Sequence, residues 1–176
     1  MKKYKLTTET LQFAGRTLHR IKAVKDFDSI KAGEFGGWIE NEKNLSQDDN
    51  AWIYGNAMVF DNAKVYGNAK VYGNANVSDY ANVFGNANVF GNAAIKGDAK
   101  VHDAVDYIVF KNFWSSGRYF TWTSSNNKWS VGCFYGTGEE LIKKAYADSE
   151  KSGREYERVV RYVESILADE KKEKSN

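Results

Sequence analysis

The stretch AWIYGN AMVFDN AKVYGN AKVYGN ANVSDY ANVFGN ANVFGN AAIKGD AKVHDA, residues 51–104, decides the fold of this chain. Every block of six begins with alanine, and a valine or isoleucine follows two residues later, from Ile53 to Val101. A period of six fits neither the 3.6-residue period of a helix nor the two-residue alternation of a long strand. It predicts short strands joined by regular corners.

The residue types in each block indicate an interior and its corners. The branched Val or Ile fills the inner wall, the small Ala fits beside a tight bend, and Gly and Asn tolerate the positive φ that corners need. Two further blocks, IENEKN and LSQDDN (residues 39–50), precede the others in the same frame, so that eleven blocks run without a gap. Because one coil cannot bury its own wall, the blocks are stable only as a stack, with coils about 4.8 Å apart.

The blocks resemble the repeats of the hexapeptide-repeat proteins. The stretch KAGEFGGWIENEKNLSQDDNAWIYGNA (residues 31–57) is similar to the segment that leads into the repeat in uncharacterised members from bacteria and their phages. The resemblance implies a triangular, left-handed parallel β-helix with three blocks per coil. It says less about function, since this fold serves acyltransferases, anhydrases and purely structural proteins alike.

Both flanks of the repeat lose the six-residue frame. Tyr4–Leu6 and Thr17–Val24 are predicted strands with a turn at Ala14–Gly15, and the exposed end of a solenoid needs such a cover. We therefore predict a mainly β chain. Its expected parts are an N-terminal β cap (residues 1–38), the β-helix solenoid (39–104), a small C-terminal α+β domain (105–170) and a flexible tail (171–176).

The α+β domain is expected to be a β-meander covered by two helices. Its predicted strands are Asp106–Lys111, Arg118–Thr123 and Lys128–Phe134, which turns rich in Ser, Gly and Asn separate. Capping boxes that begin at Thr137 and Ser152 predict the two helices. Cys133 alternates with Val131 along the last strand, which favours a buried core thiol.

Composition excludes several classes of protein. A net charge of +2 on 176 residues gives no general attraction to nucleic acid or anionic lipid. The start MKKYKL lacks the apolar stretch of a secretory signal, and no run of 18 apolar residues occurs, so we expect a cytoplasmic protein. One cysteine and two histidines exclude a disulfide framework and predict no metal or other cofactor.

Acyl transfer is the enzymatic alternative that the resemblance raises. Acyltransferases of this kind use a histidine base beside a coenzyme A channel, usually with a loop extruded from a coil. Here His102 stands in the last block, His19 lies in a predicted cap strand, and no insertion interrupts the blocks. The glycine-rich segment 132–138 precedes a helix but lacks the Lys-Ser/Thr pair of a phosphate loop. We therefore expect a protein that is not an enzyme, with acyl transfer as the runner-up.

The outward positions of the repeat carry many aromatic side chains. With eighteen residues per coil, they fall into columns on two faces of the solenoid. Such ladders stabilise strand stacking, yet two of them exceed what a monomer usually leaves in water. We predict that at least one face is an interface to another copy, to the α+β domain or to a partner protein. Its candidate residues are Trp52, Tyr54, Tyr72 and Phe90 with Lys70 on one face, and Tyr66 and Phe84 on the other.

The sequence therefore favours a scaffold that binds a protein partner and forms a homo-oligomer, either a dimer or a trimer. The similarity to phage chains implies a host factor as the partner, for example a defence nuclease such as a CRISPR effector. Nucleic-acid binding through the C-terminal domain is a further alternative, because bases stack on aromatic rings beside positive charge. Its candidate residues are Arg118, Tyr119, Trp122, Lys128 and Trp129.

Overall fold

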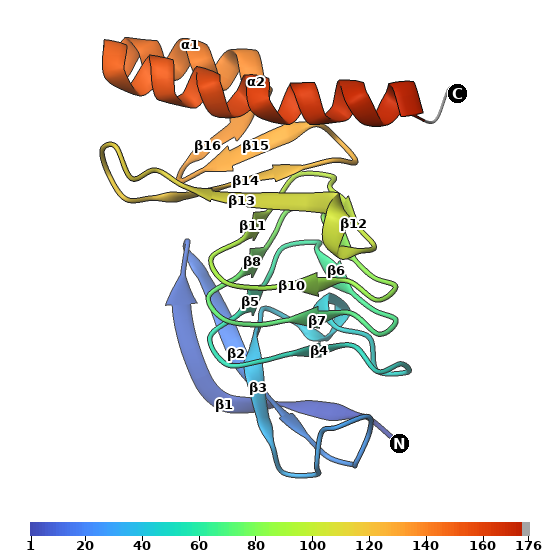
Figure 1. The fold of residues 1–176 in the computed structure, drawn as a ribbon. Coiled ribbons are helices and arrows are strands. Elements are labelled where there is room, and N and C mark those ends of the chain that lie inside the picture. The colour runs from blue at the N-terminus through green and yellow to red at the C-terminus, as the bar shows by residue number, and fades with distance from the viewer. Residues whose placement is uncertain (174–176) are drawn as a thin grey trace.

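The computed structural model describes residues 1–173 and shows a mainly β molecule around a parallel β-solenoid of about four turns (Figure 1). Three sheets form the walls of the solenoid. The first wall holds β3 (Phe35–Ile39), β5 (Met58–Val59), β8 (Asn76–Val77) and β11 (Ala94–Ile95). The second holds β4 (Trp52–Ile53), β7 (Lys70–Val71) and β10 (Asn88–Val89). The third holds β6 (Lys64–Val65), β9 (Asn82–Val83) and β12 (Lys100–Val101).

The predicted repeat of eighteen residues per coil is confirmed. Trp52 pairs with Lys70 and Lys70 pairs with Asn88, which places residues eighteen apart directly above one another. The Val and Ile column from Ile53 to Val101 is buried at 0–1% exposure, as is the Ala column beside it. Stacked branched side chains thus fill the solenoid. The left-handed sense that the resemblance implies stays a prediction.

The first coil corrects the expected run of eleven blocks in one frame. Ile39 pairs with Val59 and Leu45 forms a bridge to Val65, so this coil is two residues longer than the others. The additional residues lie between Leu45 and Ile53, in a polar stretch where Asp49 Oδ2 accepts a hydrogen bond from the backbone N–H of Gly67. A loop of polar residues leaves the wall here and returns to it. The sequence shows the shift, because the branched residue opens the first two blocks and stands third in all the others.

An antiparallel hairpin extends the first wall at the N-terminal end. It consists of β1 (Tyr4–Phe13) and β2 (Arg16–Ala23), and β2 pairs with β3. The predicted turn is confirmed, with positive φ of 50° at Ala14 and 75° at Gly15. Strand β1 is longer than predicted and passes an irregularity between Leu6 and Thr10. The hairpin therefore covers a sheet edge that would otherwise be open.

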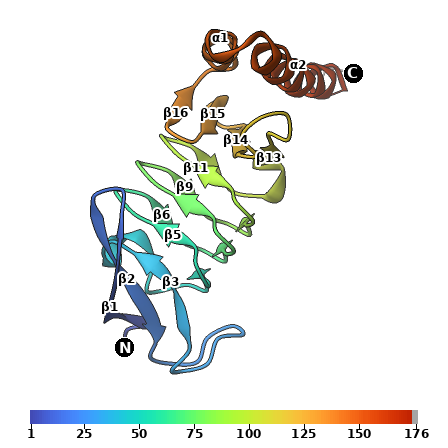
Figure 2. The same cartoon turned by 90° about the vertical axis from the view of Figure 1, so that its left-hand side faces the viewer.

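A four-stranded antiparallel meander lies across the other end of the solenoid (Figure 2). Its strands are β13 (Tyr107–Lys111), β14 (Tyr119–Thr123), β15 (Lys128–Val131) and β16 (Phe134–Gly136). The single strand predicted over Lys128–Phe134 is wrong, because the chain turns at Gly132, whose φ is +56°. Cys133 lies in this turn and is exposed, so the predicted buried thiol is also wrong.

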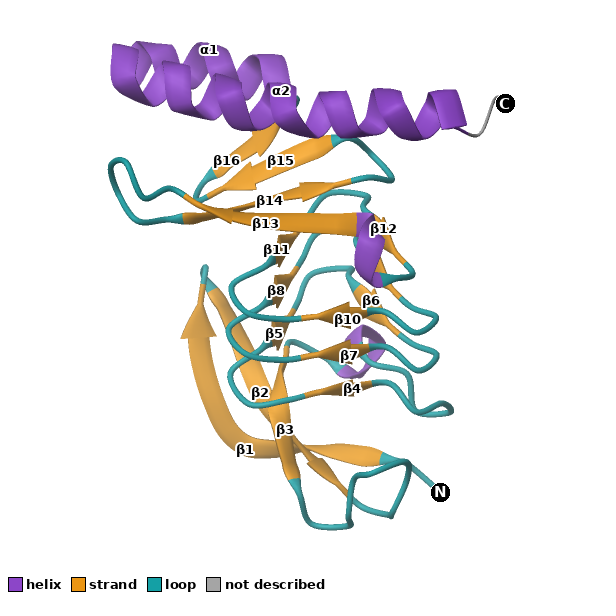
Figure 3. Cartoon of the chain, viewed as in Figure 1, coloured by secondary structure: helices purple, strands orange, loops and turns teal. Residues whose placement is uncertain are grey.

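Two helices cover the face of the meander that points away from the solenoid (Figure 3). They are α1 (Gly138–Asp148) and α2 (Glu150–Glu173). The capping box at Thr137 is confirmed, since Thr137 Oγ1 accepts from the N–H of Glu140 and Glu140 Oε2 accepts from the N–H of Thr137. The second box is wrong, because α2 begins before Ser152 and the hydroxyl of Ser149 accepts from the N–H of Ser152 instead.

The apolar stripe of α2 packs on the meander in a hydrophobic cluster separate from that of the solenoid. Tyr156, Val160 and Val163 lie in this cluster beside Phe120 and Trp129. Helix α2 continues through Glu173, and residues 174–176 of the expected tail lie outside the described residues. Over residues 1–173, no helix has both the length and the apolar character needed to cross a membrane.

Candidate functional site

An aromatic column runs up the second wall, which faces the viewer in Figure 1. Tyr72 and Phe90 follow β7 and β10, and their rings stack with centroids 5.4 Å apart and an interplanar angle of 13°. Tyr54 meets Tyr72 edge-on at 6.4 Å. Tyr72 and Phe90 remain 37% and 50% exposed. We call Tyr54, Tyr72 and Phe90 the first column.

The first column continues into the C-terminal meander. Tyr107, the first residue of β13, meets Phe90 edge-on at 6.5 Å, and its hydroxyl donates to the carbonyl of Asn88. Burial raises the pKa of Tyr107, so the phenol stays protonated and remains a donor at neutral pH. A mostly apolar groove of about 480 Å³ opens here between the last coil and the meander, with Phe90, Val109 and Tyr119 among its lining residues. The column thus ends in a groove.

The second column lies on the third wall. Tyr66 and Phe84 stack at 5.2 Å with an interplanar angle of 9°, and Phe84 meets His102 edge-on at 5.1 Å. Tyr66 is 38% exposed. His102 Nδ1 lies 2.5 Å from Asp103 Oδ2, and both side chains are about half-exposed. The stacking predicted for this face is therefore present, and a histidine–carboxylate contact closes it at the C-terminal end.

Two members of the predicted interface have partners within the chain. Trp52 is 1% exposed, because Phe27 and Tyr4 pack edge-on against it at 5.3 and 6.1 Å. Its predicted outward, accessible position is wrong, since the N-terminal segment folds over the first coil. Lys70 lies 3.0 Å from Asp28, and this ion pair raises the pKa of Lys70 and lowers that of Asp28.

The candidate nucleic-acid residues do not form a stacking platform. Trp122 and Trp129 are buried in the core between the meander and the helices, and Trp122 Nε1 donates to Asn127. These two assignments are wrong, because sequence alternation alone does not say which face of a sheet the helices cover. Arg118 and Tyr119 are exposed and Lys128 is half-buried. No base can stack on indole rings that the core encloses.

No metal centre is apparent among residues 1–173, where no group of three or more His, Cys, Asp or Glu side chains converges. His19 lies in β2 with Nδ1 3.4 Å from the carbonyl of Thr7. His102 is the other histidine and stands at the solenoid's edge rather than in an enclosed channel. Within the repeat, His102 is the only histidine, and Asp103 is its carboxylate partner.

Comparison with known proteins gives one partial likeness. No family model matches the chain. The chain is 39% identical over 62 residues to a protein of Escherichia coli (strain K12) described as an uncharacterized acetyltransferase, YdcK. The matched segment is 31% of this chain and 19% of that protein, so the chain covers only a small part of the relative's length. This coverage is too small to assign the chain to a family.

Sequence reasoning missed Tyr107 as the continuation of the first column. The repeat frame ends in the short 3-10 helix Ala104–Asp106, so no periodicity relates Tyr107 to Phe90. Only the turn of the chain onto the last coil brings the two rings together. The six-residue period predicts which residues are neighbours within the solenoid, but it predicts no contact with residues outside the repeat.

Proposed function

We propose that this protein is a non-catalytic scaffold that captures a protein partner through the first column. The observation that carries the proposal is the pair Tyr72 and Phe90, stacked flat and still 37% and 50% exposed, beside the apolar groove at Tyr107. Aromatic anchors bury a large area at a small cost in side-chain entropy. The rings are held in place before binding, because regular backbone pairing fixes the strands beside them.

The finer form of the proposal concerns the partner. We propose a host protein in the cytoplasm, for example a defence nuclease such as a CRISPR effector, with the chain encoded by a phage. We also propose self-association into a dimer or a trimer, with the second column, Tyr66 and Phe84, as a further contact surface. Affinity purification from the native host followed by identification of the copurifying protein tests the partner directly.

Substitution of the columns tests the proposal at the level of residues. Tyr72→Ser should reduce partner capture or self-association by about tenfold or more while the fold survives, since Ser78 already occupies the equivalent position on the first wall. Tyr80→Ser is the matched control, because Tyr80 is 67% exposed and lies at a corner outside both columns. Light scattering reports self-association and pull-down reports partner capture. If Tyr72→Ser and Tyr66→Ser both behave like the parent chain, the columns only stabilise the strands.

Acyl transfer is a second candidate, which the likeness to the acetyltransferase YdcK and the His102–Asp103 contact favour. A carboxylate on Nδ1 orients an imidazole so that its Nε2 accepts a proton from an attacking group. Against this candidate, the side chains of His102 and Asp103 are both about half-exposed. His102 also lines neither the groove at Tyr107 nor the cavity beside the junction of α1 and α2. Calorimetry with acetyl coenzyme A decides the matter: saturable binding that His102→Ala abolishes would place this activity ahead of the scaffold.

A further inference from the structure

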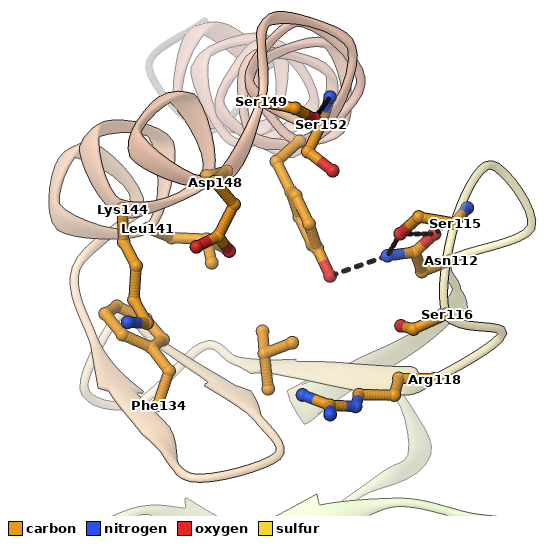
Figure 4. Close-up of a pocket in the computed structure, with 13 residues that line it drawn as sticks. Asn112, Ser115, Ser116, Arg118, Phe134, Leu141, Lys144, Asp148, Ser149 and Ser152 are labelled. Atoms are coloured by element: carbon orange, nitrogen blue, oxygen red, sulfur yellow. Dashed lines mark hydrogen bonds between the residues drawn. The ribbon is translucent and has the colours of Figure 1, made fainter.

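A second cavity, of about 390 Å³, lies in the C-terminal part of the molecule, away from both columns. The loop between β13 and β14 forms one side of it, and the junction of α1 and α2 forms the other (Figure 4). Val131, Phe134 and Leu141 give it an apolar wall. Its polar lining consists of Asn112, Ser115, Ser116, Arg118, Lys144, Asp148, Ser149, Ser152 and Tyr156.

A buried hydrogen-bond network fixes one wall of this cavity. Asn112 is 2% exposed, and its Nδ2 donates to the hydroxyls of Tyr156 and Ser115 at 3.0 and 2.9 Å. Asn112 Oδ1 accepts from the backbone N–H of Ser115. Because burial raises the pKa of Tyr156, its phenol stays protonated. The Tyr156 hydroxyl already accepts from Asn112, so its proton is available to a ligand.

Other polar groups reach the cavity without a partner of their own. Ser152 is 9% exposed, its hydroxyl points into the cavity in Figure 4, and it makes no hydrogen bond to any residue from 1 to 173. A hydroxyl that is open to the cavity and has no protein partner can donate a hydrogen bond to a ligand. Over the same described range, the side chains of Arg118, Lys144 and Asp148 form no ion pair.

The charge of the cavity selects the ligand. Arg118 and Lys144 oppose a single carboxylate, Asp148, which leaves an excess of one positive charge among the lining residues. Guanidinium, ammonium and hydroxyl groups are the donors that phosphate and carboxylate oxygens prefer.

We propose that this cavity binds a small molecule that carries a phosphate or carboxylate group together with a hydroxyl or amine donor. Arg118 and Lys144 neutralise the anionic group, and the hydroxyls of Ser152 and Tyr156 donate to its oxygens. Asp148 accepts a hydrogen bond from the donor of the ligand. The apolar wall covers the carbon skeleton, as in most small-molecule sites. This inference goes beyond the scaffold function and does not depend on it.

The test is calorimetric titration of the full chain with inorganic phosphate, ribose 5-phosphate and L-glutamate. Inorganic phosphate tests the anionic group alone, and ribose 5-phosphate tests a phosphate that also carries hydroxyls. L-glutamate represents a carboxylate with an amine. We expect saturable binding of ribose 5-phosphate or L-glutamate, weakened at least about tenfold by Arg118→Gln and by Ser152→Ala. Alanine is a good helix former, so Ser152→Ala removes the hydroxyl and leaves α2 intact.

Lys144→Gln and Lys143→Gln form a matched pair. The two lysines are consecutive on α1 and both are exposed, yet only Lys144 lines the cavity. Weaker binding in Lys144→Gln together with unchanged binding in Lys143→Gln supports the site. Equal losses in the two variants would mean unspecific attraction of anions to the helix and would overturn the proposal, as would the absence of binding by all three probes.

Discussion

The two ends of the solenoid present opposite chemistry, and the chain closes them with opposite groups. Between coils, the N–H groups of Trp52, Tyr54 and Asn68 donate to carbonyls of the following coil. Carbonyls of the first coil and N–H groups of the last coil therefore have no further coil to pair with. Because buried backbone groups must be paired, the N-terminal end needs donors and the C-terminal end needs acceptors.

The N-terminal end is closed by side-chain donors. Lys3 is 1% exposed, and its ammonium donates to the carbonyls of Asp49 and Ala51 at 2.9 and 2.8 Å. Asn44 is fully buried, and its amide donates to the carbonyls of Asp61 and Ala63 at 3.1 and 2.9 Å. Two polar side chains in an otherwise apolar position are thus explained by the carbonyls above them.

The C-terminal end is closed by side-chain acceptors. Thr121 Oγ1 accepts from the N–H of Ala94 at 2.9 Å, and Ser125 Oγ accepts from the N–H of Lys100 at 2.7 Å. Asp106 accepts from the N–H of His102 in the same way. The meander is therefore bonded to the last coil through its side chains, whereas the hairpin at the other end joins the solenoid through its backbone. The polarity of a parallel stack explains why the two covers differ.

The two end closures depend on an intact stack of coils between them, and Val71→Asp should disrupt this stack. Val71 is fully buried between Ile53 and Val89, so the variant places a carboxylate in a dry aliphatic column. We expect the free energy of unfolding to fall by about 4 kcal/mol or more. Circular dichroism should then show no cooperative unfolding of the variant at 37 °C. Val105→Asp is the control, since Val105 is 82% exposed. A Val71→Asp chain that melts within two degrees or so of the parent would disprove the inward register.

Asn44→Asp should be the next largest effect, because it reverses the hydrogen-bonding character of the N-terminal closure. The new carboxylate keeps the shape of the amide, yet it faces two carbonyl oxygens without a proton to offer. We expect the free energy of unfolding, measured with urea at pH 7, to fall by about 3 kcal/mol. Asn56→Asp adds the same charge at an exposed corner and should cost less than about 0.5 kcal/mol. Similar losses in the two variants would contradict the requirement for a donor.

Lys3 gives the N-terminal end a dependence on pH. Burial lowers the pKa of Lys3 from 10.5 to about 8, with the charge of Asp49 opposing the shift. Between these pH values the unfolded chain holds the proton and the folded chain releases it. Stability should therefore rise from pH 8 towards pH 10, by up to about 1.4 kcal/mol per pH unit.

Tyr4 limits this rise, because burial raises its pKa well above the ordinary value of 10. The unfolded chain ionises Tyr4 first, so stability should fall again above pH 10. Urea midpoints from pH 7.5 to 10 measure the rise, and Lys3→Met should remove it. A parent chain whose stability does not change over this range would show that Lys3 keeps its proton.

The smallest expected effect is Thr121→Val at the C-terminal end. Valine keeps the shape of threonine and removes the acceptor of the Ala94 N–H, which should cost about 1–2 kcal/mol in thermal unfolding. Thr10→Val on the exposed face of β1 is the control and should be neutral or slightly stabilising. If Thr121→Val is as stable as the parent, packing rather than hydrogen bonding holds the meander to the last coil.

The residues show why some predictions succeeded and others did not. Ile53 and Val71 were placed inside from the sequence because their environment repeats, and each neighbour in space lies one coil away in the chain. Trp52 has the same repeat position as Lys70, yet it is buried, because a segment outside the repeat folds over it. Cys133 was misplaced because a positive φ at Gly132 ends the strand, and period-two alternation does not detect such a turn.

The sequence by itself determined the solenoid and its inward column, because regular spacing in a parallel stack converts directly into contacts. The eighteen-residue coil, and with it the stacking of the aromatic rings, followed from the resemblance to the hexapeptide-repeat proteins. Tertiary structure alone decided which aromatic rings stay accessible, which end receives donors and which receives acceptors. It also decided that Ser152 and Arg118 share a cavity with Lys144. Those features depend on contacts between segments that no common period relates, so only the folded chain brings their residues together.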